Sequence, residues 1–115
     1  MFFKNFNQND TLEILSNIES QSFTIDSFIE KHHISQVDLI KMDIEGAERR
    51  ALAGCEQLFR DCKKIDFAIC TYHLHDDEEV ISAFLDKHNC TYRNQKGFFR
   101  HKIRSVVLRG NKKVN

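Results

Sequence analysis

The chain has 115 residues, and its 17 lysines and arginines balance its 17 aspartates and glutamates, so its formal net charge is zero at pH 7. This length suits one small domain, and the zero charge gives no electrostatic case for a nucleic-acid partner or an anionic membrane surface. No apolar run approaches the roughly 20 residues of a membrane span, and the start turns polar too early for a signal peptide, so we expect a cytoplasmic protein with no membrane partner.

The four cysteines carry no recognisable metal or redox motif. Cys55, Cys62, Cys70 and Cys90 include no Cys-x-x-Cys pair, and their spacing does not match a zinc site. We expect reduced, largely buried thiols that behave as small hydrophobes, in keeping with a reducing compartment.

Residues 1–21 are weakly patterned and are treated as a segment separate from the domain expected over residues 22–110. Leu12, Ile14, Leu15 and Ile18 could form a short strand or a short helix. A clearer helix is predicted after Thr24, whose hydroxyl can cap it. Its inward-facing residues should be Ile25, Phe28 and Ile29.

The segment 37–44 has the nearly continuous apolar character of a buried central strand in a parallel sheet. Lys41 interrupts the run and needs a partner or a route to water. The strand stops at Asp43 and Glu45. Because ligands bind at the carboxyl ends of parallel strands, these two acids lie where chemistry is expected.

From Gly46 the apolar period becomes helical. The predicted buried stripe of this helix consists of Ala47, Ala51, Cys55, Leu58 and Cys62. The predicted solvent face consists of Glu48, Arg49, Arg50, Glu56 and Arg60. Gly54 indicates either a close backbone approach or a break between two helical pieces.

A second strand is predicted over residues 65–72, followed by a helix with an acidic first turn from Asp77. Two successive strand–helix units predict a parallel strand pair. Their carboxyl ends should then lie side by side, which brings Tyr72 and His73 next to Asp43 and Glu45.

The last third of the chain predicts a β-hairpin, with strands over residues 91–93 and 104–109 joined by the polar residues 94–97. Residues from 110 onward are polar, and we expect 111–115 to be a frayed tail. Basic residues of this region alternate with Phe98 and Phe99, which superficially resembles a nucleic-acid surface. A solvated hairpin face explains them better, and no nucleic-acid partner is expected.

The segment 38–48 (DLIKMDIEGAE), followed by Leu52-Ala53-Gly54, resembles the most recognisable motif of the FkbM family of S-adenosylmethionine-dependent methyltransferases. The preceding residues 24–28 (TIDSF) look like a segment which that family places before its fourth strand. Residues 69–73 (ICTYH) are similar to its fifth strand, and residues 98–100 with 108–110 fit its final antiparallel pair. The resemblance covers residues 22–110.

This resemblance implies an α/β fold of the class I methyltransferase type. The expected structure is a partial doubly wound sheet, with two parallel strand–helix units, then an antiparallel hairpin, and without the family's first three strands. Those strands carry the glycine-rich turn and the acid that hold the cofactor, and residues 1–21 contain no glycine. S-adenosylmethionine is thus the implied cofactor, its binding residues are unknown, and we expect the chain alone not to bind it.

The resemblance also implies roles for the strand-end residues. Asp43 is the first candidate to position a small acceptor, such as a carbohydrate hydroxyl, or to act as its base, and His73 is the second. Glu45, Tyr72 and His75 are predicted on the acceptor side. Glu45 is expected to bond helix backbone N–H groups rather than the acceptor.

Two alternatives stay open. Asp43, Glu45, His73, His75 and Asp76 could gather as ligands of a divalent metal, although their spacing is not diagnostic and no metal site is assigned. The chain could also be a non-catalytic remnant, or one half of a split protein, that associates with another chain through an exposed sheet edge.

Overall fold

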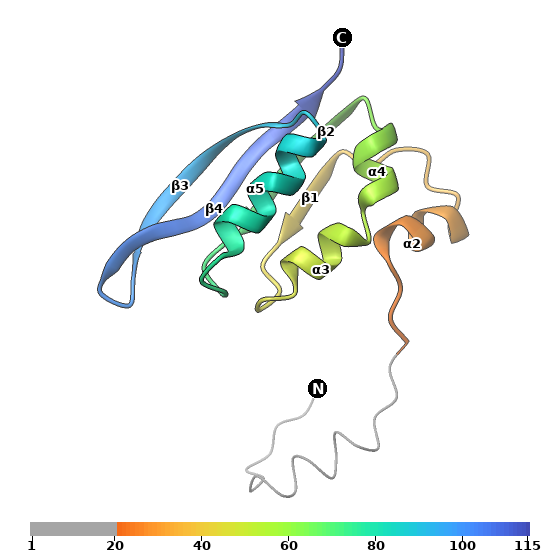
Figure 1. The fold of residues 1–115 in the computed structure, drawn as a ribbon. Helices are drawn as coiled ribbons and strands as arrows, with labels where there is room; N and C mark the ends of the chain where they lie inside the picture. The colour runs from red at the N-terminus through yellow and green to blue at the C-terminus, as the bar shows by residue number, and fades with distance from the viewer. Residues whose placement is uncertain (1–20) are drawn as a thin grey trace, which may run out of the picture.

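A computed structural model describes residues 21–115 of the chain, so the predicted element around Leu12–Ile18 lies outside the described residues. The helices and strands, shown in Figure 1, are α2 (Ile25–Lys31), β1 (Leu39–Met42), α3 (Glu48–Ala53), α4 (Glu56–Asp61), β2 (Lys64–Cys70), α5 (Asp77–Lys87), β3 (Thr91–Phe99) and β4 (Lys102–Lys113).

The four described strands form one mixed sheet in the order β1-β2-β4-β3. β1 and β2 are parallel, and their register pairs Leu39 with Asp66 and Met42 with Ile69. β4 runs antiparallel to both β2 and β3. The predicted α/β class, the parallel pair and the closing hairpin are therefore confirmed.

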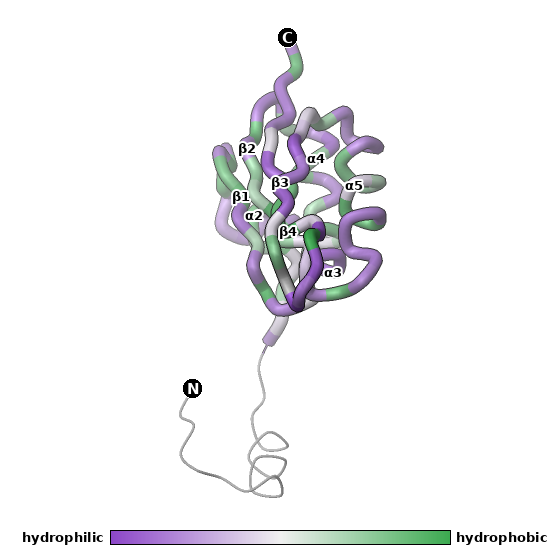
Figure 2. Tube along the Cα trace, turned by 90° about the vertical axis from the view of Figure 1, so that its left-hand side faces the viewer, coloured by the Kyte–Doolittle hydropathy of each residue, from purple (hydrophilic) through white to green (hydrophobic). Residues whose placement is uncertain are grey.

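The doubly wound detail is not seen in the described part of the sheet. α3, α4 and α5 cover the same face (Figures 1 and 2). The opposite face carries Leu39, Lys41 and Asp66 and is open to a shallow depression of about 710 Å³. β1 is also an edge strand here rather than the expected central one, because its outer side has no neighbour among the described strands.

Side chains that alternate along the strands build the core between sheet and helices. The sheet contributes Ile40, Met42, Ile65, Phe67, Ile69 and Leu108. The helices contribute Leu52, Phe59, Ile81 and Leu85, and the break between α3 and α4 contributes Cys55. Lys41 lies on the uncovered face and is exposed, so its side chain reaches water directly. This is one of the two arrangements predicted for it, a partner or a route to water.

Both readings of Gly54 are confirmed. α3 ends at Ala53 and α4 begins at Glu56, so the predicted helix is broken into two pieces. A Cβ on Gly54 would lie 3.0 Å from the Cβ of Thr24, so the glycine also permits a close approach between α2 and the break. α2 begins after Thr24, as predicted, and Thr24 Oγ1 accepts a hydrogen bond from the Ser27 backbone N–H at 3.1 Å.

The predicted faces of two helices are partly wrong. Ala47 is exposed because it lies before the first residue of α3, and the buried positions of α3 are Glu48 and Leu52. Beyond the break the predicted residues Cys55, Leu58 and Cys62 still face the core. Phe28 of α2 was expected to face inward but is exposed. α2 contacts α4 through the Asp26 carboxylate, and its Ile25 packs against the core.

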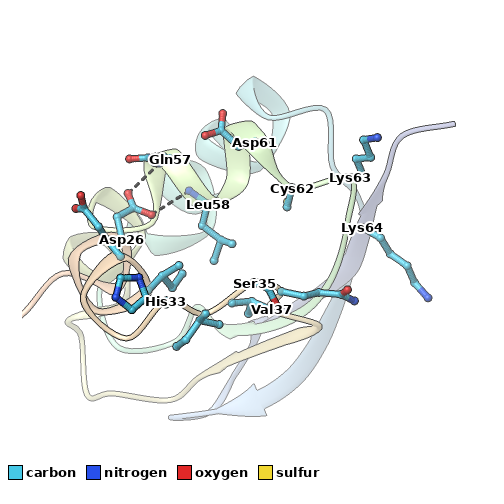
Figure 3. Close-up of a pocket in the computed structure, with 14 residues that line it drawn as sticks. Asp26, His33, Ser35, Val37, Gln57, Leu58, Asp61, Cys62, Lys63 and Lys64 are labelled. Atoms are coloured by element: carbon cyan, nitrogen blue, oxygen red, sulfur yellow. Dashed lines mark hydrogen bonds between the residues drawn. The ribbon is translucent and has the colours of Figure 1, made fainter.

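Tertiary contacts cap both ends of α4. The Asp26 carboxylate accepts hydrogen bonds from the backbone N–H groups of Gln57 and Leu58, each at 2.9 Å (Figure 3). At the other end, Lys112 Nζ donates to the carbonyl oxygens of Phe59 and Arg60. A helix of six residues leaves most of its terminal backbone groups without intrahelical partners, so these two side chains complete it.

The tail and the hairpin turn differ from the sequence prediction. Residues 111–113 belong to β4, and Lys112 is buried, so the expectation of a frayed tail is wrong for them. Residues 94–97 lie within β3 rather than in a loop, because the chain turns later, at Arg100 and His101, which adopt φ angles of 47° and 65°. This two-residue turn contains no glycine that would have marked it.

The four cysteines are free thiols, as predicted. Burial raises the pKa of Cys55 to about 12, which leaves it protonated and unreactive near neutral pH. No helix within residues 21–115 combines the length and the apolar character that crossing a membrane requires.

Replacing Asp26 by alanine should destabilise the fold by about 1 kcal/mol, because the two N–H groups at the start of α4 lose their acceptor. Urea unfolding followed by circular dichroism measures the change. Glu30→Ala is the matched control, since Glu30 is an exposed acid of the same helix. Equal midpoints for the two variants would show that the cap is unimportant.

Candidate functional site

The site lies where the two parallel strands end. Asp43 follows β1 directly, and Tyr72 and His73 follow β2 after one residue. The register that places Met42 beside Ile69 carries these three side chains to the same edge of the sheet. The structure therefore brings together the predicted strand-end residues, while their chemical roles stay predictions.

Asp43 is the common partner of the aromatic residues. Tyr72 Oη donates a hydrogen bond to Asp43 Oδ1 at 3.0 Å. His73 Nε2 lies 3.6 Å from the same oxygen, and the rings of Tyr72 and His73 stack with centroids 4.1 Å apart. The bond to Asp43 raises the pKa of Tyr72 to about 12, so the phenol remains a hydrogen-bond donor at neutral pH.

Glu48 is the buried anchor of this edge. Its side chain has no exposed surface, its Oε1 accepts from Ile44 N at 2.8 Å, and its Oε2 accepts from Gly46 N at 3.0 Å. The same Oε1 lies 3.1 Å from His73 Nδ1. One carboxylate thus holds the turn after β1 and faces the histidine that follows β2.

The role expected of Glu45 belongs to Glu48. Glu45 has 86% of its side chain exposed and makes none of the expected bonds to helix backbone. Glu45 and Gly46 both adopt positive φ angles, 58° and 96°, so the chain reverses sharply before α3. That reversal directs Glu45 outward and turns the N–H groups of the loop toward Glu48.

Sequence reasoning placed Glu48 on the solvent face, which is wrong. A usable signal did exist, because an acid at the start of a helix, two residues after a glycine, can bond free N–H groups of the turn that leads into the helix, as Glu48 bonds those of Ile44 and Gly46. Helical periodicity outweighed this signal in the prediction.

Only three of the five residues that were considered as metal ligands lie together. Asp43, Glu45 and His73 each offer a ligand atom, and these atoms all lie within 4.8 Å of one another. His75 is 95% exposed and contacts Asp76 at 3.8 Å, on the side that faces the hairpin. Asp76 is held by Arg49, so neither residue belongs to the group around Asp43.

Arg49 ties α3 to the loop that carries His73. Its Nη2 lies 2.6 Å from Asp76 Oδ1 and 2.8 Å from Asp77 Oδ1, and the Asp77 carboxylate also accepts from Leu74 N at 2.8 Å. The hydrogen bond from Arg49 lowers the pKa of Asp76 below its usual value. This tether keeps the two strand-end loops in fixed relation.

The cavity of about 730 Å³ shown in Figure 3 lies at the opposite end of the parallel strands. Its lining includes Val37, which precedes β1, and Lys63 and Lys64 at the start of β2. It is therefore formed at the amino ends of the strands, away from Asp43 and His73, and it accommodates the Asp26 cap.

A family model described as the methyltransferase FkbM domain matches residues 3–94. The match includes the strand-end residues Asp43, Glu45, Tyr72 and His73. It also reaches into the N-terminal segment that showed little pattern, and it ends within β3. None of the curated proteins and none of the solved structures compared with the chain matches it.

Glu48→Gln should lower the free energy of unfolding by about 2 kcal/mol, because an amide offers one acceptor oxygen where two backbone N–H groups need two. Glu45→Gln removes the same charge from an exposed position and should change stability by less than about 0.5 kcal/mol. Chemical unfolding of both variants measures the difference. If Glu48→Gln were as stable as Glu45→Gln, the anchoring role of Glu48 would be wrong.

Proposed function

This chain belongs to the FkbM methyltransferase family, and we propose that it serves the transfer of a methyl group from S-adenosylmethionine to a hydroxyl oxygen of a carbohydrate or similar small acceptor. The observation that carries the proposal is the half-exposed Asp43 carboxylate, held beside Tyr72 and His73 at the carboxyl ends of two parallel strands inside the matched segment.

Methyl transfer to a hydroxyl needs an acceptor oxygen aligned with the methyl group and a base that takes the hydroxyl proton. The acceptor oxygen attacks the sulfonium methyl in line, a new C–O bond forms as the C–S bond breaks, and the hydroxyl proton needs a base. Asp43 is our candidate to position the hydroxyl and take the proton, since 47% of its side chain is open to solvent. His73, at 3.6 Å from it, is the candidate to accept the proton next.

The other predicted acceptor residues receive secondary roles. Tyr72 orients the Asp43 carboxylate through its hydrogen bond. Glu45 extends from the same turn toward solvent and is proposed to contact polar groups of the acceptor. His75 is almost fully exposed, so we propose that it contacts only the outer part of a large acceptor.

The cofactor side of the site remains unassigned. The four glycines of the sequence are Gly46, Gly54, Gly97 and Gly110, and none lies in a glycine-rich turn after a strand. We therefore propose that the unit over residues 22–110 supplies the acceptor side, and that residues 21–115 alone do not hold S-adenosylmethionine.

Asp43→Asn should lower the turnover of methyl transfer by roughly 10²-fold or more while leaving the fold intact, because an amide cannot take the proton. The assay uses labelled S-adenosylmethionine, a reconstituted full-length enzyme in which this chain is joined to a cofactor-binding half, and a panel of mono- and oligosaccharides. Glu30→Gln, far from the strand ends, should retain full turnover. Equal turnover in Asp43→Asn would remove Asp43 from the chemistry, and absence of transfer to every hydroxyl acceptor would contradict the proposed function.

One observation favours a second candidate function, association with another chain through the sheet. The outer side of β1 has no neighbour among the described strands, Leu39 is 62% exposed, and the face around it is uncovered. A strand edge with free backbone groups readily pairs with another strand. We propose this as the role of the chain if it has no catalytic activity of its own.

Leu39→Lys should reduce such association, because a charge beside a strand edge opposes further pairing. Light scattering over a concentration series should show a mass that rises with concentration for the natural chain but stays monomeric for this variant. Ile103→Lys is the control, since Ile103 is equally apolar and 74% exposed but lies at the hairpin. A natural chain that is monomeric throughout would exclude the second candidate.

A further inference from the structure

We propose that Asp43, Glu45 and His73 form a binding site for one divalent metal ion, with Glu48 as the residue that positions His73. The three ligand atoms lie within 4.8 Å of one another at the carboxyl ends of β1 and β2. The site is formed by two different strand-end loops, which the Arg49 ion pairs hold together.

The buried histidine is the observation that points to a ligand. Only 10% of the His73 side chain is exposed, and neither of its ring nitrogens makes a well-aligned hydrogen bond. Nε2 lies 3.6 Å from Asp43 Oδ1 and 3.6 Å from Glu45 Oε1. Buried polar atoms are nearly always paired, so an unpaired imidazole nitrogen that faces two carboxylates calls for a positive partner.

The position of Glu48 selects which nitrogen faces the ion. Its carboxylate lies 3.1 Å from His73 Nδ1 and is already fixed by two backbone N–H groups, so it is the natural acceptor for a proton on Nδ1. The lone pair of Nε2 then points toward Asp43 and Glu45. A carboxylate behind a histidine is the usual arrangement at metal sites, where it orients the ring and increases its basicity.

The spacing and the donor set define the class of ion. Ligand atoms bound at about 2.1 Å to one ion lie about 3 to 3.5 Å apart when they are neighbours in its coordination shell. The two separations from His73 Nε2, both 3.6 Å, need only a small contraction. The oxygens of Asp43 and Glu45, which lie within 4.8 Å of each other, must also approach, and the exposed Glu45 side chain is free to do so. Two carboxylate oxygens balance a charge of +2. With one imidazole they suit Mn²⁺ or a similar first-row ion and leave positions open for water.

The ion site goes beyond the proposed methyl transfer and does not depend on it. With the ion bound, His73 would serve as a ligand and would no longer accept the proton from Asp43. The open positions would take hydroxyl oxygens of the acceptor, and the ion would make those hydroxyls more acidic. Binding of the metal alone is measurable without cofactor or acceptor. Absence of methyl transfer would therefore not contradict the metal site, and absence of metal binding would not contradict the proposed methyl transfer.

Titration of the full chain with Mn²⁺, followed by electron paramagnetic resonance and calorimetry, tests the proposal. We expect one ion per chain, and at least tenfold weaker binding in Asp43→Asn and in Glu45→Gln. The exposed position of Glu45 makes its substitution harmless to the fold, and circular dichroism verifies this. Spin-echo modulation from an imidazole nitrogen should be present in the natural chain and lost in His73→Gln.

His75→Gln is the matched control, because it removes a neighbouring histidine that is exposed and lies outside the three-residue group. Its affinity for Mn²⁺ should equal that of the natural chain. Absence of Mn²⁺ binding at millimolar concentration would overturn the proposal and leave His73 as a protonated ion-pair partner. Binding that survives both acid substitutions, or that shows no nitrogen coupling, would overturn it as well.

Discussion

The buried carboxylate of Glu48 is the interaction on which the candidate site depends. A charged group without solvent contact is costly unless its oxygens are hydrogen-bonded, and here the backbone N–H groups of Ile44 and Gly46 supply those bonds. These bonds stabilise the sharp turn between β1 and α3. The oxygen of Glu48 that bonds Ile44 also faces His73. The turn after β1 therefore helps to orient the His73 ring, which follows β2.

Other polar side chains also bind backbone groups or charged side chains that are distant in the sequence. Asp26 and Lys112 complete the two ends of α4 from distant parts of the chain, and Arg49 joins α3 to the loop before α5. Short helices of six residues gain little from their own backbone bonds, so such side chains contribute much of what keeps them in place. Of these contacts, the ion pairs of Arg49 reach the loop that carries His73 and hold it against α3, as positioned catalytic or ligand groups require.

The site and the open sheet lead to distinct functional consequences. Asp43, Tyr72 and His73 meet at the carboxyl ends of the parallel strands, within a domain of the FkbM methyltransferase family, and there we propose the transfer of a methyl group to a hydroxyl. The outer edge of β1, beside the exposed Leu39, is where we propose association with another chain. Both features depend on β1, whose parallel register with β2 gathers the site and whose outer side has no neighbour among the described strands. α3, α4 and α5 cover one face of the described sheet (Figure 2).

By itself, the sequence determined the α/β class, the parallel pair, the closing hairpin, the cap at Thr24, the break at Gly54 and the strand-end positions of Asp43 and His73. Local signals carry this information, because apolar period, capping residues and glycine act over a few neighbouring positions. Only the tertiary structure decided that Glu48 is buried while Glu45 is exposed, that Lys112 ends a helix instead of fraying, and that His75 lies apart from Asp43. These outcomes depend on partners distant in the chain or on the reversal at Gly46, which periodicity does not register.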